Sequence, residues 1–470
     1  MSRCFGLKLS NIGKAGIGYL IGNVLLRGIS FFSIPLFTFL MSPDEYGKYI
    51  VYMSYEAFLV VIIKLGLSGT LRNAKVEFKE NFEEYFYNIL IVMSVLLSIV
   101  LIIVETLRLF ALVDYKFSNI IMFVLVVHAY CDSVFDAYLT KLSTAYDYKR
   151  YIILSFIITI TGIMLSLIFI KFCFIDSISS NRILGCALPY FVITIIIIIT
   201  TLKGNVGGPN HYIIKYALRL AIPLCVHALS LTVLSNLDRI MISEMIDDND
   251  AGVYSLMSSF ANMLSLIWYS VNTAWNQWVY DQLTAKHDNK VKKVSKVYVS
   301  VALVVFGIVS LVLPEIVVLM TDDRYHIGIS ILPALCVGAF FSMPYSLYVL
   351  LENYYKQTKY VAIGTVLAGV INILLNYIFI SRYGYEAAAY TTMGSYFFLY
   401  FFHFCMVRLI MKKRIYDNGY IFTMTVSALP IMLLCIKLSG FMLIRWGIAI
   451  AIMIATMFGL YLVNKRVIND

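Results

Sequence analysis

Charged residues are scarce in this chain of 470 residues. Only 14% of the residues are charged, against roughly 25% in a soluble globular domain, and 61% are hydrophobic, with a mean hydropathy of +0.84. This scarcity excludes a soluble globular protein. The net charge of +10 does not indicate nucleic-acid binding, because the basic residues are dispersed among short loops and form no dense patch with interleaved aromatic residues. The composition therefore predicts a polytopic membrane protein.

The sequence also lacks cysteine pairs and long polar segments. None of the eight cysteines belongs to a CxxC pair, and most lie inside apolar runs, so we expect neither a zinc site nor a disulfide framework. No segment between the apolar runs is long enough to fold as a separate domain. We therefore expect no cofactor and no catalytic domain, and any chemistry would take place inside the helical bundle.

Long apolar runs are what the sequence has in abundance. Each is long enough for a membrane-spanning helix, and the alternating pattern of a membrane barrel is absent. They cover residues 17–41, 49–71, 87–104, 117–139, 151–174, 183–202, 216–242, 251–279, 297–320, 327–351, 360–380, 385–407, 420–438 and 441–463. The fold class predicted is an all-α polytopic membrane protein with about 14 transmembrane helices.

The loops between these runs predict the orientation. If the N-terminus is cytoplasmic, 25 Lys and Arg residues fall in cytoplasmic segments and 9 fall on the opposite side. Cytoplasmic loops of membrane proteins carry such an excess of positive charge. This distribution predicts that both termini lie in the cytoplasm.

A short internal repeat suggests how the helices are grouped. The sequence DEYGKY at 44–49, after the first run, recurs as NDAGVY at 249–254, six runs later. An even number of intervening helices preserves orientation, so the two halves would be parallel repeats. We predict an N-terminal lobe over 1–202, a C-terminal lobe over 203–414 and a C-terminal helix pair over 415–470. A transporter with a cavity between its two lobes fits this organisation.

Arg27 lies in the middle of the first apolar run. A guanidinium in hydrocarbon costs from roughly 2.5 kcal/mol upward, so it is expected to face a wet cavity or a partner. Asn23, one turn earlier, would lie on the same face of the helix. Lys64 is the other basic residue deep in a run.

Six segments carry a resemblance to a known family. They are LMSPDEYGKY (40–49), LGLSGTLR (65–72), AIP (221–223), NLDR (236–239), AGVY (251–254) and GYEAAA (384–389). In order and spacing they resemble bacterial Wzx-type O-antigen flippases of the multidrug/oligosaccharidyl-lipid/polysaccharide exporter superfamily. The resemblance implies ion-coupled, alternating-access export of undecaprenyl-pyrophosphate-linked oligosaccharide across the inner membrane. Its implied partners are that lipid-linked substrate, the bilayer, a polysaccharide polymerase and a chain-length regulator.

Arg27 and Lys64 are the candidates for binding the pyrophosphate of such a substrate. Arginine can bind phosphate oxygens with two parallel hydrogen bonds, whereas lysine acts as a point charge. The alternative is an ion pair inside the bundle, for example with Asp132. Related flippases also carry basic residues in the eighth helix, where this sequence has only asparagines, Asn262, Asn272 and Asn276.

His128, Asp132 and Asp136 recur every fourth residue in the run 117–139 and form one stripe on a helix. Titratable groups in spanning helices often relay protons or bind ions, so this stripe is a candidate coupling site. Binding of sugar hydroxyls and pairing with Arg27 or Lys64 are the alternatives. A metal site is disfavoured because no third ligand is evident.

Other polar residues in the runs have structural interpretations. Asp238 and Arg239 lie near the outer end of their run, where a helix cap or a lobe contact is expected. His227 and His403 are single polar residues, which a neighbouring helix would satisfy.

Two other classes of protein are weighed against the flippase. A multidrug antiporter of the same superfamily would prefer an acidic residue in the first helix, and Arg27 argues against it. A polysaccharide polymerase or ligase would be expected to carry a large external loop, which the sequence lacks. We therefore predict no catalytic residues and no enzyme.

Overall fold

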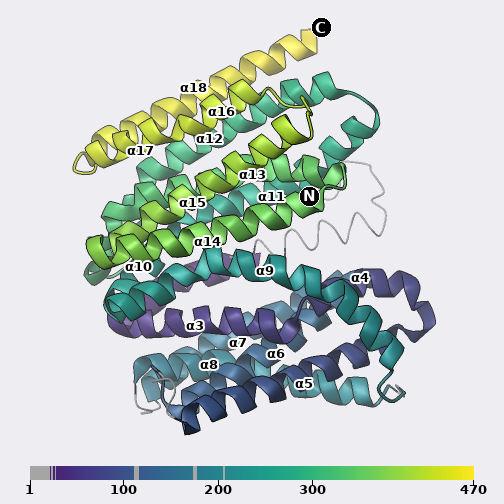
Figure 1. The fold of residues 1–470 in the computed structure, drawn as a ribbon. Coiled ribbons are helices and arrows are strands. Elements are labelled where there is room, and N and C mark those ends of the chain that lie inside the picture. The colour runs from purple at the N-terminus through teal and green to yellow at the C-terminus, as the bar shows by residue number, and fades with distance from the viewer. Residues whose placement is uncertain are drawn as a thin grey trace. The chain divides into compact units, whose positions relative to one another are not determined.

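The computed structural model describes residues 22, 25–26, 28–110, 116–172, 177–204 and 207–469, except for the side chains of 266, 267, 269, 270, 273 and 457–469. Its regular elements within these ranges are all helices (Figure 1). The predicted all-α polytopic fold is therefore confirmed. In hydrocarbon a backbone must satisfy its hydrogen bonds internally, and a helix does so within one segment.

The chain divides into two compact units. The first holds the described residues up to Met41 together with Lys48–Asn236, and the second holds Ser42–Gly47 and Leu237 onward. The division between the two units thus falls within α9. The predicted division into two lobes and a C-terminal pair remains a prediction.

The first unit is built from one short and several long helices. They are α2 (Ile34–Leu40), α3 (Pro43–Lys64) from Lys48 onward, α4 (Leu67–Glu77), α5 (Phe82–Leu109), α6 (Asn119–Thr144), α7 (Tyr148–Phe172), α8 (Ile178–Leu202) and the first part of α9 (His211–Met245). Its largest core cluster joins α5 and α6 through buried residues such as Tyr85, Phe86, Val126 and Val134.

The second unit begins with the end of α9. It continues with α10 (Asp248–Ala261), α11 (Met263–Thr284), α12 (Asp288–Met320), the 3-10 segment Asp323–Ile331, α13 (Leu332–Tyr354), α14 (Thr358–Tyr383), α15 (Tyr385–Cys405), the π turn Met406–Ile410, α16 (Asn418–Val426), α17 (Ala428–Lys437) and α18 (Met442–Asn469).

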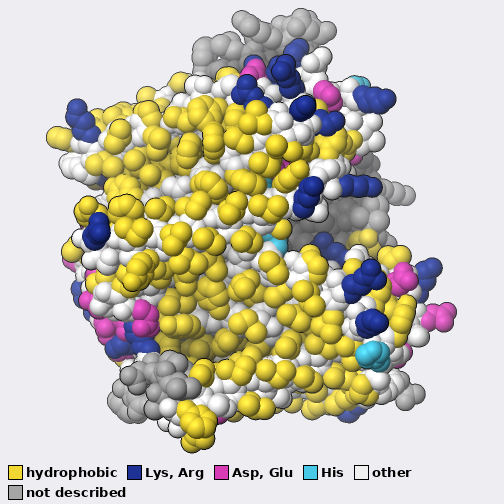
Figure 2. Space-filling model, viewed as in Figure 1, with side chains coloured by type: hydrophobic (Ala, Val, Ile, Leu, Met, Phe, Trp, Pro, Cys, Tyr) yellow, Lys and Arg dark blue, Asp and Glu magenta, His cyan; other side chains and the backbone are white. Residues whose placement is uncertain are grey.

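The described parts of the fourteen predicted runs fall largely on helices. Among the described residues, eleven helical stretches are long and apolar enough to span a membrane, and shorter apolar helices cover Gly28–Leu40 and Met442–Thr456. The run 251–279 is divided between α10 and α11. Figure 2 shows hydrophobic side chains over the middle of the visible face, with most charged side chains toward its edges. This distribution suits a surface that contacts hydrocarbon.

A break at Leu65 and Gly66 divides the second predicted run into α3 and α4. Both residues have positive φ, 49° and 75° respectively. A Cβ atom on Gly66 would lie 2.6 Å from the carbonyl oxygen of Ala221, so only glycine fits there without displacing the backbone. Because of this break, Lys64 is the last residue of α3.

Candidate functional site

Three acidic residues and one lysine gather in the first unit, where α3 faces α6. Glu56 and Lys64 lie two turns apart on α3, and Asp132 and Asp136 lie one turn apart on α6. The carboxyl group of Asp132 is repelled by those of Glu56 and Asp136. The ammonium of Lys64 attracts both Glu56 and Asp132. We call these four residues the acidic cluster.

Two contacts between α3 and α6 fix the position of the acidic cluster. The hydroxyl of Ser133 lies 3.4 Å from the carbonyl oxygen of Val60, midway between Glu56 and Lys64. The ammonium of Lys64 lies 3.2 Å from the carboxylate of Asp136, with side chains 23% and 43% exposed. The pairing of an acid with Lys64, one of the alternatives for the stripe on α6, is therefore present. Both side chains are still accessible enough for another charged group to replace either partner of the ion pair.

His128 lies among aromatic rings, at the other end of the stripe. It is 3% exposed, and its Nδ1 lies 3.2 Å from the hydroxyl of Tyr52 on α3. The Tyr52 ring stacks at 6.0 Å, and that of Tyr190 meets the imidazole edge-on at 5.2 Å. His128 therefore shares the stripe with Asp132 and Asp136 but is enclosed, so it holds α3 against α6.

Glu56 is a functional candidate that the sequence reasoning missed. It is 5% exposed, and its Oε1 has no hydrogen-bond partner within the part of the chain that the structure describes. A buried carboxylate oxygen without a donor is costly, and ionisable groups in spanning helices usually have a functional role. The signal in the sequence was an acidic residue in the middle of the apolar run 49–71.

Arg27 and Asn23, the other predicted binding residues, lie outside the described residues. Lys64 is thus the described member of the predicted pyrophosphate pair. With three acids against Lys64, the acidic cluster carries an excess of negative charge when all are ionised. No group of His, Cys, Asp and Glu within the described ranges is close enough to hold a metal ion. A proton is the cation that these acids can accept one at a time.

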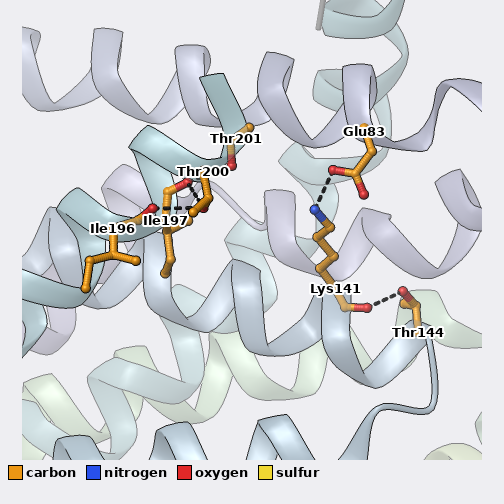
Figure 3. Close-up of polar contacts among 7 residues, drawn as sticks. All are labelled: Glu83, Lys141, Thr144, Ile196, Ile197, Thr200 and Thr201. Atoms are coloured by element: carbon orange, nitrogen blue, oxygen red, sulfur yellow. Dashed lines mark hydrogen bonds and ion pairs between the residues drawn. The ribbon is translucent and has the colours of Figure 1, made fainter. Parts of the chain in front are cut away.

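One end of α6 is anchored by a separate ion pair, drawn in Figure 3. The ammonium of Lys141 lies 2.6 Å from the carboxylate of Glu83 on α5, and the Lys141 carbonyl accepts from Thr144. The same ammonium lies 4.5 Å from the ring centre of Phe86, a cation–π contact. This anchor fixes α6 against α5 and so holds the acidic stripe in place.

A second buried carboxylate, Asp238, lies in the second unit. It accepts hydrogen bonds from Tyr254 at 2.7 Å, Asn376 at 2.6 Å and Thr392 at 2.6 Å. These donors come from α10, α14 and α15. Of the two expectations for Asp238, a helix cap and a lobe contact, the structure excludes the cap, because α9 continues to Met245. Neutral donors from three other helices satisfy the carboxylate instead.

A neighbouring helix pairs with the Nδ1 of His403, as expected, whereas the Nε2 of His403 has no hydrogen-bond partner in the described part of the chain. Its Nδ1 lies 2.8 Å from the carboxylate of Glu352 on α13, and both side chains are fully buried. A Cβ atom on Gly364 would lie 2.6 Å from the imidazole Nε2, so α14 packs closely on this pair.

The overall arrangement is shared with known transporters. The structure is similar to one described as "Lipid II flippase MurJ, inward closed conformation", with a TM-score of 0.74, 17% identity, and 95% of this chain and 100% of that chain covered. It is also similar to an inward-facing multidrug resistance MATE family transporter of the MOP superfamily, with a TM-score of 0.63, 13% identity, and 82% and 94% covered. The fold of this chain is therefore shared with these two solved structures.

Sequence comparisons identify the family. The family model "Polysaccharide biosynthesis protein" matches residues 12–275, and the MatE model matches residues 223–378. A curated relative, "Lsg locus putative protein 1" of Haemophilus influenzae, is 20% identical over 383 residues, covering 77% of this chain and 89% of that protein. Because the first of these family models matches more than half of the chain, the chain belongs to the polysaccharide biosynthesis protein family.

Proposed function

We propose that this chain moves undecaprenyl-pyrophosphate-linked oligosaccharides from the inner to the outer leaflet of the bacterial inner membrane by alternating access. The family match over residues 12–275 carries the proposal. The acidic cluster supports it, because ionisable groups inside spanning helices commonly mark substrate or ion pathways. The proposed protein partners are a polysaccharide polymerase and a chain-length regulator, which would use the exported units.

Lys64 and Arg27 are the proposed pyrophosphate-binding residues, with Asn23 beside Arg27. In the structure Lys64 is held by Asp136 at 3.2 Å, and both side chains are partly exposed. An oxygen of the incoming pyrophosphate would replace the Asp136 carboxylate on Lys64. An exposed ion pair is worth only about 0–1 kcal/mol, so this exchange is energetically easy.

The same exchange couples substrate binding to a proton. Once the pyrophosphate has replaced Asp136 on Lys64, the positive charge of Lys64 no longer balances the three carboxyl groups of the acidic cluster. Because these groups then repel one another, uptake of a proton by one of them is favoured. Asp132 and Asp136 are the proposed proton acceptors, and Glu56 adds to the repulsion. His128 positions α3 against α6.

Transport by the purified protein tests this function. The full chain is reconstituted in vesicles with a fluorescent lipid-linked oligosaccharide, and its movement between leaflets is followed with and without a proton gradient. We expect movement without chemical change. New glycosidic products would indicate an enzyme, and absence of movement in either gradient direction would contradict the flippase.

A multidrug antiporter is the second candidate, favoured by one observation. The acidic cluster has three carboxylates and one lysine, and this excess of negative charge would also suit an organic cation. Ethidium exchange for protons in the same vesicles tests it. Exchange of ethidium without movement of the lipid-linked oligosaccharide would favour the antiporter.

A further inference from the structure

An apolar cavity of about 330 Å³ lies in the second unit among α11, α12 and α13. Its lining includes Trp268 and Trp275 on α11, Val297 and Tyr298 on α12, and Phe340 on α13. The Tyr298 ring is stacked 4.0 Å from that of Trp275 and lies 4.4 Å from that of Trp268. We call this space the aromatic pocket.

The aromatic pocket opens through aliphatic side chains. Val294, Val297 and Val301 on its rim are 37%, 55% and 37% exposed, and the last two lie inside the apolar run 297–320 of α12, a candidate spanning helix. Exposed valines at such a place contact hydrocarbon and not water. A hydrocarbon chain can therefore enter from the side.

The size and chemistry of the aromatic pocket suit an unsaturated chain. An apolar cavity of about 150 Å³ binds one benzene molecule, so this one holds about a dozen carbon atoms. The indole N–H of Trp268 is buried and has no hydrogen-bond partner in the described part of the chain. A carbon–carbon double bond offers π electrons to an N–H, which a saturated acyl chain does not.

Exposed lysines lie next to the opening. Lys290 precedes Val294 by four residues, and Lys293 precedes Val297 by four, so each lies one turn before a rim valine on the same face of α12. Lys296 is engaged by Asp417 at 2.7 Å. Lys290 and Lys293 give the opening a positive charge that complements a phosphate.

We propose that the aromatic pocket binds the isoprenoid chain of a polyprenyl phosphate carrier, with the phosphate held at Lys290 and Lys293. The proposal rests on the proposed function, because such a carrier is the lipid part of the substrate. It adds a binding site for the lipid that is separate from the acidic cluster, since the two lie in different units. The ligand class is a phosphate-bearing polyprenyl lipid and not a bulk phospholipid.

Photocrosslinking tests this site. The full chain carries a photoreactive benzoylphenylalanine in place of Val301, in nanodiscs of phosphatidylcholine with radiolabelled undecaprenyl phosphate. The matched control carries it at Val318, which lies on the same helix and is 52% exposed but does not line the pocket. We expect about tenfold more labelled protein from position 301. Equal labelling at both positions would overturn the proposal.

Competition identifies the occupant. Unlabelled undecaprenyl phosphate should abolish labelling at position 301, and undecaprenol, which lacks the phosphate, should compete much less. Phosphatidylglycerol is the second anionic lipid tested. If it competes as well as undecaprenyl phosphate, the pocket binds ordinary phospholipid and the proposal fails.

The lysines have their own test. The double substitution Lys290→Gln with Lys293→Gln should reduce labelling at position 301 about tenfold, or about 1.4 kcal/mol. Lys359→Gln, an exposed lysine at the start of α14, is the control and should leave it unchanged. Unchanged labelling in the double variant would show that the phosphate is not held there.

Transport measured in the same preparations separates this inference from the proposed function. If the wild-type chain moves lipid-linked oligosaccharide while position 301 is not labelled, only the inference fails. If position 301 is labelled specifically but nothing is moved, the proposed function fails and the binding site stands.

Discussion

Gly47 and Gly252 lie against each other in the second unit, and neither leaves room for a side chain. A Cβ atom added to either glycine would lie 3.0 Å from the backbone nitrogen of the other. It would also collide with a carbonyl oxygen, that of Asp248 for Gly47 and that of Pro43 for Gly252. When the two copies of the repeat are aligned, Gly47 corresponds to Gly252, and Pro43 corresponds to Asp248. The contact is therefore reciprocal, with each copy presenting the same backbone atoms.

We predict that Gly47→Ala and Gly252→Ala each destabilise the protein. Forcing a methyl group into packed backbone typically costs about 1–3 kcal/mol. Thermal unfolding of the detergent-solubilised protein should show a lower midpoint and less monodisperse protein. Gly394→Ala on α15 is the control, because a Cβ atom there meets nothing within 4 Å. Equal stability of all three variants would contradict the close contact.

The orientation predicted from the loops can be tested by cysteine labelling. In a background without the eight native cysteines, Lys292→Cys and Lys412→Cys should react only with a reagent that reaches the cytoplasm. Asp323→Cys, whose native side chain is fully exposed, should react from the opposite side. Reaction of positions 292 and 323 from the same side would refute the fourteen-helix topology.

The ion pair between Lys64 and Asp136 allows binding to be separated from structure. Lys64→Gln should reduce transport by about tenfold or more, with little change in abundance, because a partly exposed pair contributes about 0–1 kcal/mol. The charge swap Lys64→Asp with Asp136→Lys should keep abundance but not transport. Recovery of transport by the swap would show that the pair is only structural.

The acids of the acidic cluster predict a dependence of transport on the proton gradient. Asp132→Asn, Asp136→Asn and Glu56→Gln should each weaken the response of transport to an imposed gradient, since each removes a titratable group. Asp147→Asn, an acid paired with Arg150 at the start of α7, is the control. If the three variants respond to the gradient as the wild type does, these acids do not couple transport to protons.

Arg27 is predicted to bind the pyrophosphate directly. Arg27→Lys should keep part of the transport because the charge survives without the two-pronged hydrogen bonding, whereas Arg27→Ala should lose most of it. Arg27→Glu should lose all of it, with normal insertion in each case. Loss of folded protein in Arg27→Ala, reversed by combining Arg27→Asp with Asp132→Arg, would indicate a structural ion pair instead.

The sequence by itself determined the class of the protein and the positions of its helices. A spanning segment must be apolar and must satisfy its own backbone hydrogen bonds, so composition and run length locate most of the described helices. Breaks such as the one at Gly66 were not predicted, because they depend on the carbonyl of Ala221, which is distant in the sequence. The stripe of His128, Asp132 and Asp136 follows from the helical period alone.

Only the tertiary structure decided which side chains meet. That Lys64 pairs with Asp136, that Glu56 joins the same cluster, and that His128 is enclosed by Tyr52 all depend on how α3 and α6 are rotated against each other. Hydrophobic runs do not encode that rotation, since lipid-facing and buried positions are equally apolar. The network around Asp238 likewise required helices far apart in the sequence to be brought together, and the aromatic pocket required the packing of three successive helices.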